Sequence, residues 1–101
     1  MVKKEQFKNM QGGSAITLLC IRSDTKEGWG KKINNGTVEI FIPSHSNESQ
    51  RNQIVVNYLT ELLPVNANQI EILAGKKDLL IVTILDILSE QVNKAFANVL
   101  K

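Results

Sequence analysis

The polar run PSHSNESQRN, residues 43–52, holds the residue types from which a hydrolytic site could be built. It contains the chain's single histidine, His45, which would act as general base, with Glu48 to orient it. The nucleophile would be one of the run's serines, Ser44, Ser46 or Ser49. The chain has no GxSxG elbow, no Walker loop, no HExxH motif and no second histidine for a metal site. Because the residue types come without a motif, we expect a non-enzymatic protein.

The same run is also what the start of a helix requires. Apolar residues recur after it at the helical i, i+3, i+4, i+7 spacing, as Val55, Tyr58, Leu59 and Leu62. Pro64 ends this pattern. Serine and asparagine side chains accept hydrogen bonds from the free N–H groups of a first helical turn, and a glutamate favours the positive end of the helix dipole. A helix start therefore accounts for most of the run and leaves Arg51 and Asn52 for another role.

Basic residues near two predicted turns give a second hypothesis, the binding of a nucleic acid such as RNA or of another polyanion, and this is the function that we prefer from the sequence. The candidate binding residues are Glu48, Arg51, Asn52, Gly75, Lys76 and Lys77. Cationic side chains beside a helix N-terminus suit a phosphate or a carboxylate. The alternative is that these are solvated charges at turns. The net charge of +2, from 12 basic and 10 acidic residues, is too small for the broad positive field of a dedicated nucleic-acid binder.

The elements that would position these residues follow from the hydrophobic patterns. The run 15–21 is apolar on both faces, as in a well-covered strand, and 37–42 alternates as a half-buried strand. Because Asn35-Gly36 is a turn signal between them, we predict that the two strands form a β-hairpin. A second hairpin is predicted from strands 70–74 and 78–86, and a helix follows each hairpin. The predicted order is ββαββα, typical of an α+β domain.

The chain of 101 residues, with 43% hydrophobic and 22% charged side chains, has the size and composition of one soluble globular domain. Residues 1–13 have little apolar periodicity and end in Gly12-Gly13, so we expect a flexible tail before a single domain at 14–101. The longest nearly apolar run, 79–88, is shorter than the roughly 20 residues of a membrane span. With no signal-like segment, we expect a cytoplasmic protein without a membrane span.

Cysteine and tryptophan each occur once, and neither is predicted to carry a function. The run around Cys20 is apolar, so we expect a small buried hydrophobe rather than a nucleophile, which needs an electropositive and partly open setting. One cysteine also allows no internal disulfide and no multi-cysteine metal site. Trp29 lies between Gly28 and Gly30, and we expect it to cap the edge of the core rather than to serve as a ligand platform. No cofactor or metal is predicted.

A third hypothesis is a protein–protein interaction through the sheet itself. A two-layer fold covers one face of its sheet and leaves the other open, and apolar residues on the open face favour burial against another chain. Phe41, Leu80 and Val82 are the candidates for such a face. The partner would be another protein or a second copy of this chain. The alternative is that the N-terminal segment covers the face.

A resemblance to a known family is carried by the stretch NNGTVEIFIPSHSNESQRNQIVVNYLTELLPVNANQIEILAG, together with the predicted element order. Over about residues 14–97 the chain resembles the YggU-like family, whose members are small proteins of uncharacterised function. Its acidic, asparagine and turn-glycine positions match Glu48, Asn52 and Gly75. The family's Gly-Lys-Ala is replaced here by residues 49–51 (SQR), and its Ser-Arg and Lys after the turn by residues 78–81 (DLLI).

This resemblance implies an architecture but no reaction. It implies a two-layer α+β domain, in which a four-stranded sheet carries two helices packed on one face. The positive charge that the family places after the turn stands earlier in this chain, at Lys76 and Lys77. On the first helix the basic residue is shifted by one position to Arg51, which turns it by about 100° around the helix axis.

Overall fold

The computed structural model describes residues 13–33 and 35–100, which form a mixed β-sheet with two α-helices. In chain order the elements of this part are β2 (Gly13–Ser23), β3 (Gly28–Lys32), β4 (Val38–Pro43), α1 (Glu48–Leu62), the 3-10 turn η2 (Ala67–Gln69), β5 (Ile70–Ala74), β6 (Leu79–Leu85) and α2 (Ser89–Ala97). The predicted α+β class is confirmed. Residues 1–12 of the predicted tail lie outside the described residues, and Gly13 is the first residue of β2.

The sheet of the described residues has 5 strands in the order β3-β4-β2-β6-β5, one strand more than predicted. β2 runs parallel to β4, and the other neighbouring pairs are antiparallel. The predicted hairpin between 15–21 and 37–42 is wrong, because β3 lies between them in the chain and pairs with β4 at the sheet edge. The element order is therefore βββαββα instead of ββαββα.

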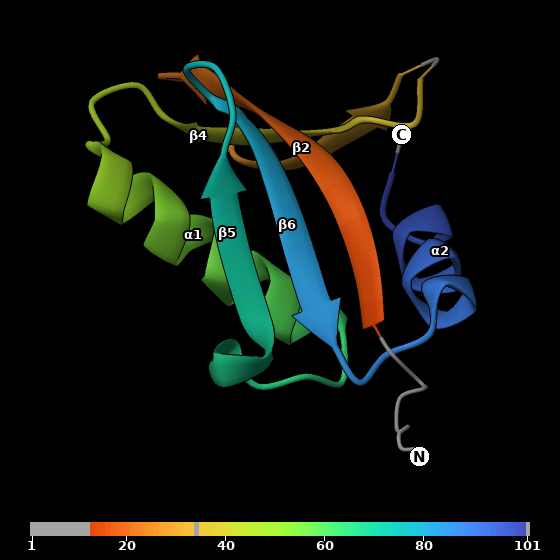
Figure 1. Cartoon of the computed structure of the whole chain (residues 1–101). Coiled ribbons are helices and arrows are strands. Elements are labelled where there is room, and N and C mark those ends of the chain that lie inside the picture. Colours follow the sequence, from red (N-terminus) through yellow and green to blue (C-terminus); the bar gives the residue numbers. More distant parts are fainter. Residues whose placement is uncertain (1–12, 34, 101) are drawn as a thin grey trace.

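Both helices pack on one face of the sheet and share one hydrophobic core. Alternate residues of the three central strands point to that face and are buried: Leu18, Cys20, Val38, Ile40, Ile42, Leu80, Val82 and Ile84. Against them pack Val55 and Leu59 of α1 and Val92 and Phe96 of α2. In Figure 1, α1 lies behind β5 and β6, and α2 lies beside the lower half of β2. The architecture thus has two layers, with the opposite face of the sheet left without a helix.

Trp29 of β3 is half-buried and packs against the edge of the core between the two helices. Its ring meets Tyr58 of α1 and Phe96 of α2 edge-on, with ring centroids 5.9 Å and 4.9 Å away. Such T-shaped pairs are the favoured geometry for aromatic rings. The predicted position of Trp29 at the edge of the core is confirmed.

β2 is a long strand that is shared between two neighbours. Its residues 13–19 pair with β6, and its residues 18–23 pair with β4. The two pairings overlap only in the middle of the strand. The end of β2, the end of β4 and the start of β6 consequently meet at one end of the sheet, and α1 begins beside them (Figure 1). The predicted strand 15–21 lies inside β2.

Candidate functional site

The polar loop before α1 is built as a helix start. Asn47 is the N-cap: its Oδ1 accepts the Gln50 backbone N–H at 2.8 Å, and its own N–H donates to Gln50 Oε1 at 2.8 Å. Ser46 Oγ donates to the Pro43 carbonyl at 2.9 Å. Glu48 is the first residue of α1 and is exposed. The prediction of a helix start is confirmed. Of the candidate nucleophiles, Ser46 is held in this loop by its bond to Pro43.

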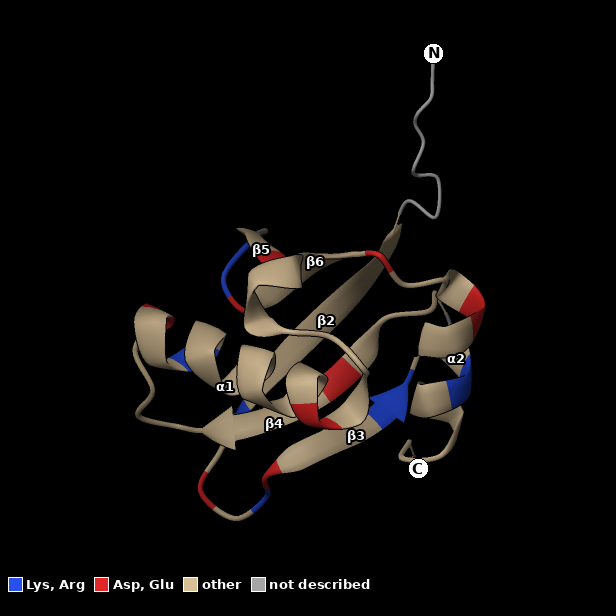
Figure 2. Ribbon diagram, turned by 90° about the horizontal axis from the view of Figure 1, so that it is seen from below, with Lys and Arg blue, Asp and Glu red and all other residues tan. Residues whose placement is uncertain are grey.

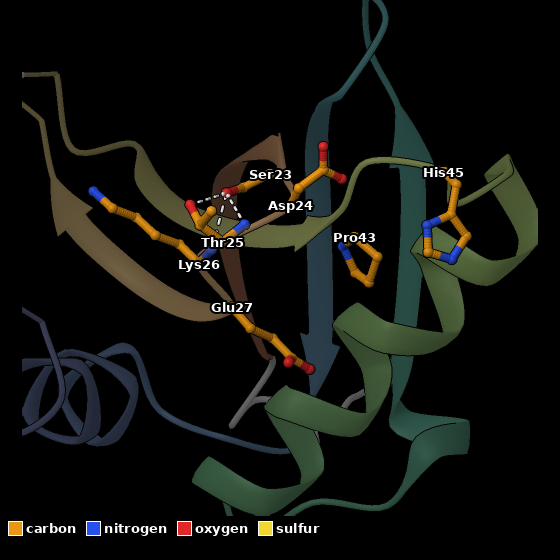
Figure 3. Close-up of a pocket in the computed structure, with 7 residues that line it drawn as sticks. All are labelled: Ser23, Asp24, Thr25, Lys26, Glu27, Pro43 and His45. Atoms are coloured by element: carbon orange, nitrogen blue, oxygen red, sulfur yellow. Dashed lines mark hydrogen bonds between the residues drawn. The ribbon is translucent and has the colours of Figure 1, made fainter.

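His45 borders a hollow of about 220 Å³ formed by the loops after β2 and β4. Figure 3 shows the lining residues: Ser23, Asp24, Thr25, Lys26, Glu27, Pro43 and His45. The Ser23 hydroxyl oxygen accepts two backbone N–H groups of its own turn, at 3.1 Å and 2.9 Å. The Ser44 hydroxyl donates to Asp24. Within the described residues, these serine hydroxyls are therefore engaged in turns and loops, and the geometry assembles no triad around His45.

Arg51 was predicted to bind a ligand at the surface, but the structure places its side chain in the interior. Only 2% of it is exposed, because its side chain reaches from the first turn of α1 under the turn between β5 and β6. Its Nη1 donates to the Lys77 carbonyl and to Asp78 Oδ1, both at 3.2 Å, and its Nε donates to Asn52 Oδ1 at 3.1 Å. The structure thus brings Arg51, Asn52 and Lys77 together, with Arg51 directed into the protein.

Asp78 and Arg22 complete this charged cluster, and sequence reasoning missed both. Arg22 Nε donates to Asp78 Oδ2 at 2.8 Å, and Arg22 Nη2 donates to Oδ1 at 3.2 Å. Arg22 Nη1 also donates to the carbonyls of Ser44 and Ser46. A signal existed, because the end of β2 and the start of β6 share one end of the sheet once the two strands are paired as antiparallel neighbours.

The charges of the cluster shift the pKa of Asp78. The hydrogen bond from Arg22 holds the pKa of Asp78 below its ordinary value, and Arg51 lowers it further against the opposing effect of burial. Nη2 of Arg51 is buried without a hydrogen-bond partner among the described residues. A buried guanidinium needs a carboxylate to compensate its charge, and for Arg51 this carboxylate is that of Asp78. The cluster therefore joins α1, β2 and the β5–β6 turn as a structural unit.

Gly75, Lys76 and Lys77 form the turn between β5 and β6. The Gly75 N–H donates to the Leu79 carbonyl at 2.8 Å, and the Leu79 N–H donates to the Lys76 carbonyl at 2.9 Å. Lys77 has a φ of 51°, in the left-handed region. Lys76 and Lys77 are exposed, whereas Arg51 is buried. Of the predicted basic surface, the two lysines are the part that solvent reaches.

Gly75 is required by close packing of backbone, which gives a testable prediction. A Cβ at this position would lie 2.7 Å from the Leu79 carbonyl oxygen. We expect Gly75→Ala to lower the free energy of unfolding by about 1–3 kcal/mol in urea denaturation. Gly36→Ala is the matched control, since Gly36 has a φ of 89° but no atom within 4 Å of its added Cβ, and its cost comes from the backbone alone, about 1 kcal/mol. An unchanged stability of Gly75→Ala would contradict this turn geometry.

Cys20 lies beside the charged cluster and is buried, as predicted. It is 4% exposed, and its backbone N–H donates to the Asp78 carbonyl at 2.9 Å. Burial raises the pKa of the Cys20 thiol to about 11, and the opposing influence of Arg51 is smaller. The thiol is therefore neutral at pH 7 and shielded from solvent, which is the opposite of a reactive cysteine.

The sheet face away from the helices, here called the open sheet face, carries exposed aliphatic side chains. Its residues are Ala15, Thr17, Leu19 and Ile21 of β2, Glu39 and Phe41 of β4, Glu71 and Leu73 of β5, and Leu79, Ile81, Thr83 and Leu85 of β6. The exposed fraction is 48% for Leu73, 45% for Ile81 and 57% for Leu85. β6 has no charged residue, and the ribbon in Figure 2 is tan along it.

The prediction for this face was partly wrong. Phe41 does lie on the open sheet face, with Lys26 Nζ 5.2 Å from the centre of its ring. Leu80 and Val82 are 0% exposed and face the helices, so the exposed residues of β6 are their neighbours Leu79 and Ile81. The sequence left this choice open because β6 is apolar at both alternations, and a strand turns every side chain over when its phase shifts by one residue.

Three further findings bear on the kind of site. Within residues 13–33 and 35–100, no group of three or more His, Cys, Asp or Glu side chains is placed to hold a metal ion. In the same part of the chain, no helix has both the length and the apolar character needed to cross a membrane. Comparisons with protein-family models, with curated proteins and with solved structures found no significant match.

Proposed function

We propose that the protein is a non-enzymatic interaction module that binds another protein chain through the open sheet face. The observation that carries this proposal is the exposure of Leu79 and Ile81 on β6 and of Leu73 beside Ile81 on β5. Leu73 and Ile81 are direct cross-strand neighbours, and Ile81 in turn lies opposite Thr17 of β2. Contiguous exposed apolar surface on a sheet is the usual mark of an interaction site, whereas single exposed aliphatic residues are common everywhere.

The charge distribution supports a protein partner at this face. On the strands at its centre, β6 has no charged residue, and the charged residue of β2, Arg22, belongs to the helix-side cluster. The carboxylates of the face belong to Glu39 and Glu71, on strands to either side of this pair. An apolar centre with charge at its periphery is the composition of a protein–protein interface.

We expect Ile81→Lys to abolish association at this face without unfolding the protein, because residue 81 is solvent-exposed in the isolated chain. Light scattering after size exclusion, up to millimolar concentration, should show the mean mass of the wild type rising with concentration. Ile81→Lys should stay at the monomer mass of 11.3 kDa. Asn57→Lys, on the exposed side of α1, is the matched control and should behave as the wild type does. A wild type that stays monomeric throughout would exclude a second copy as the partner.

A second candidate function is polyanion binding at the β5–β6 turn. It is favoured by the exposed Lys76 and Lys77, whose turn is joined to the first turn of α1 through Arg51. Amide shifts on titration with short single-stranded RNA should concentrate at these two lysines and weaken steeply with salt. Joint replacement of both lysines by glutamine should remove the shifts, whereas Lys94→Gln on α2 should not. Shifts that are spread over the surface, or absent at low salt, would speak against this candidate.

We also propose that the chain is a divergent YggU-like protein that works in the cytoplasm. The support for the family is the match of Glu48, Asn52 and Gly75 to family positions, and Gly75 has a structural reason in the close approach of Leu79. The support for a reducing compartment is the lone Cys20. A YggU-like protein whose structure lacks the parallel pairing of β2 with β4 would argue against the relation.

A further inference from the structure

Within residues 13–33 and 35–100, about half of β2 has one backbone edge that no strand pairs with. Residues 13–19 pair with β6 on one side, but on the other side the pairing with β4 begins only at Leu18, opposite Val38. Among the described residues, no strand pairs with residues 13–17 on that second side. A strand edge of this kind offers backbone N–H and C=O groups at the spacing that another extended chain can pair with.

This edge is one wall of a groove of about 380 Å³. Ala15, Ile16 and Thr17 line it in succession, which places the groove against the backbone edge and not above one face of the strand. The opposite wall is one side of α2 and the residues after it, at the helical spacing i, i+3, i+4, i+7: Asn93, Phe96, Ala97 and Leu100. Figure 1 shows α2 alongside the lower half of β2.

The groove is apolar at its base, and at its upper end Asn35 and Gly36 of the turn before β4 line it together with Lys32. Ile16 and Phe96 belong to the core or pack against it, and Val38 marks the point where β4 takes over the pairing. Lys32 pairs with Val38 across β3 and β4 and also lines the groove, so its exposed ammonium stands at the end of the free edge. A peptide lying in line with β4, on the side before Val38, would therefore have the β2 backbone beside it, apolar side chains beneath it and the Lys32 ammonium at its end.

We propose that this groove binds an extended peptide as an added strand, parallel to β2 and in line with β4, with the peptide's C-terminal carboxylate at Lys32. A parallel peptide ends at the level of Val38, because β2 runs toward that end. Five residues, the length of the free edge, span about 16 Å in a strand. Alternate side chains face the helices, so apolar residues are required at every second position. This site is separate from the open sheet face and does not depend on the function proposed there.

The probe for this proposal is the acetylated peptide Thr-Val-Thr-Val-Thr with a free carboxyl terminus, titrated into the full chain and followed by backbone amide shifts. Shifts should concentrate at residues 13–17 and at Asn93 and Ala97. The same peptide with a C-terminal amide should bind about fivefold more weakly, as should the acid peptide with Lys32→Gln. A peptide with N-methyl groups on alternate residues should not bind, because it cannot pair with the strand edge.

Two variants separate the groove from other surfaces. Ala97→Trp places a large ring in the groove at an exposed position and should abolish binding, whereas Ala67→Trp, also exposed, should leave it unchanged. Absence of shifts at millimolar peptide, equal binding of the N-methylated peptide, or full binding by Ala97→Trp would each overturn the proposal. Shifts confined to the open sheet face, at Leu79 and Ile81, would overturn the groove while leaving the proposed function of that face intact.

Discussion

An Asp78→Asn substitution is expected to lower the free energy of unfolding by about 3 kcal/mol at pH 7, because it leaves the buried Arg51 guanidinium without its carboxylate. This loss lies at the lower end of the range for buried ion pairs because the Asp78 side chain is 23% exposed. Urea denaturation measures it. Lys76→Ala, in the same turn but exposed, is the control and should change stability by less than about 0.5 kcal/mol.

The same variant should change how stability depends on pH. The pKa of Asp78 is lowered below its ordinary value of 3.8, chiefly by the hydrogen bond from Arg22. A carboxyl group with a lowered pKa stabilises the fold above its unfolded pKa, and this contribution is lost as the pH falls through the folded pKa. The difference between wild type and Asp78→Asn should therefore be largest near neutrality and shrink below about pH 4. A difference that is constant with pH, or smaller than about 1 kcal/mol at pH 7, would contradict the role of this cluster.

Phe96→Ala is expected to cost about 3–5 kcal/mol, because Phe96 is 5% exposed and its ring fills the space between α2 and Trp29. Loss of the ring removes an aromatic contact and leaves a cavity beneath α2. Thermal and urea unfolding followed by tryptophan fluorescence would report both the stability and the altered surroundings of Trp29.

Phe41→Ala is the matched control for this prediction, since Phe41 is the same residue type on the open sheet face. Its ring is half-buried and has no helix above it, so we expect a loss of less than about 1.5 kcal/mol. An equal loss of unfolding free energy for the two variants would contradict the difference between a core position at Phe96 and a half-buried position at Phe41.

The parts of the fold that followed from the sequence are those with a strong local pattern. The helix after the polar loop was predicted from the spacing of Val55 and Leu59, and both are buried against the sheet. β3 was missed because its sequence, GWGKK, has no alternation and few β-forming residues. It holds its place through Trp29 at the edge of the core and through pairing with β4, which are tertiary effects that no local pattern carries.

In the candidate site, too, local patterns were predictable and tertiary contacts were not. Arg51, Asn52 and the lysines of the β5–β6 turn were named as one candidate surface, but the sequence left open whether they lie at the same end of the sheet. The hydrogen bond from Arg51 to the Lys77 carbonyl places Arg51 at this turn. The burial of Arg51 could not be predicted, because it depends on pairing with Asp78, which lies far away in the sequence. The residues of the open sheet face required the phase of β6, and an apolar strand such as LLIVTIL fits either phase.

Photo-crosslinking in living cells would show whether the open sheet face binds another protein chain. A photoreactive phenylalanine analogue would replace Leu85 on the face or, as control, Asn57 on the outer side of α1. We expect discrete protein adducts from position 85 that disappear when Ile81→Lys is added, and none of these adducts from position 57. An adduct of twice the chain mass would identify a second copy as the partner. No adduct from position 85, or the same adducts from both positions, would mean that this face does not bind another protein chain.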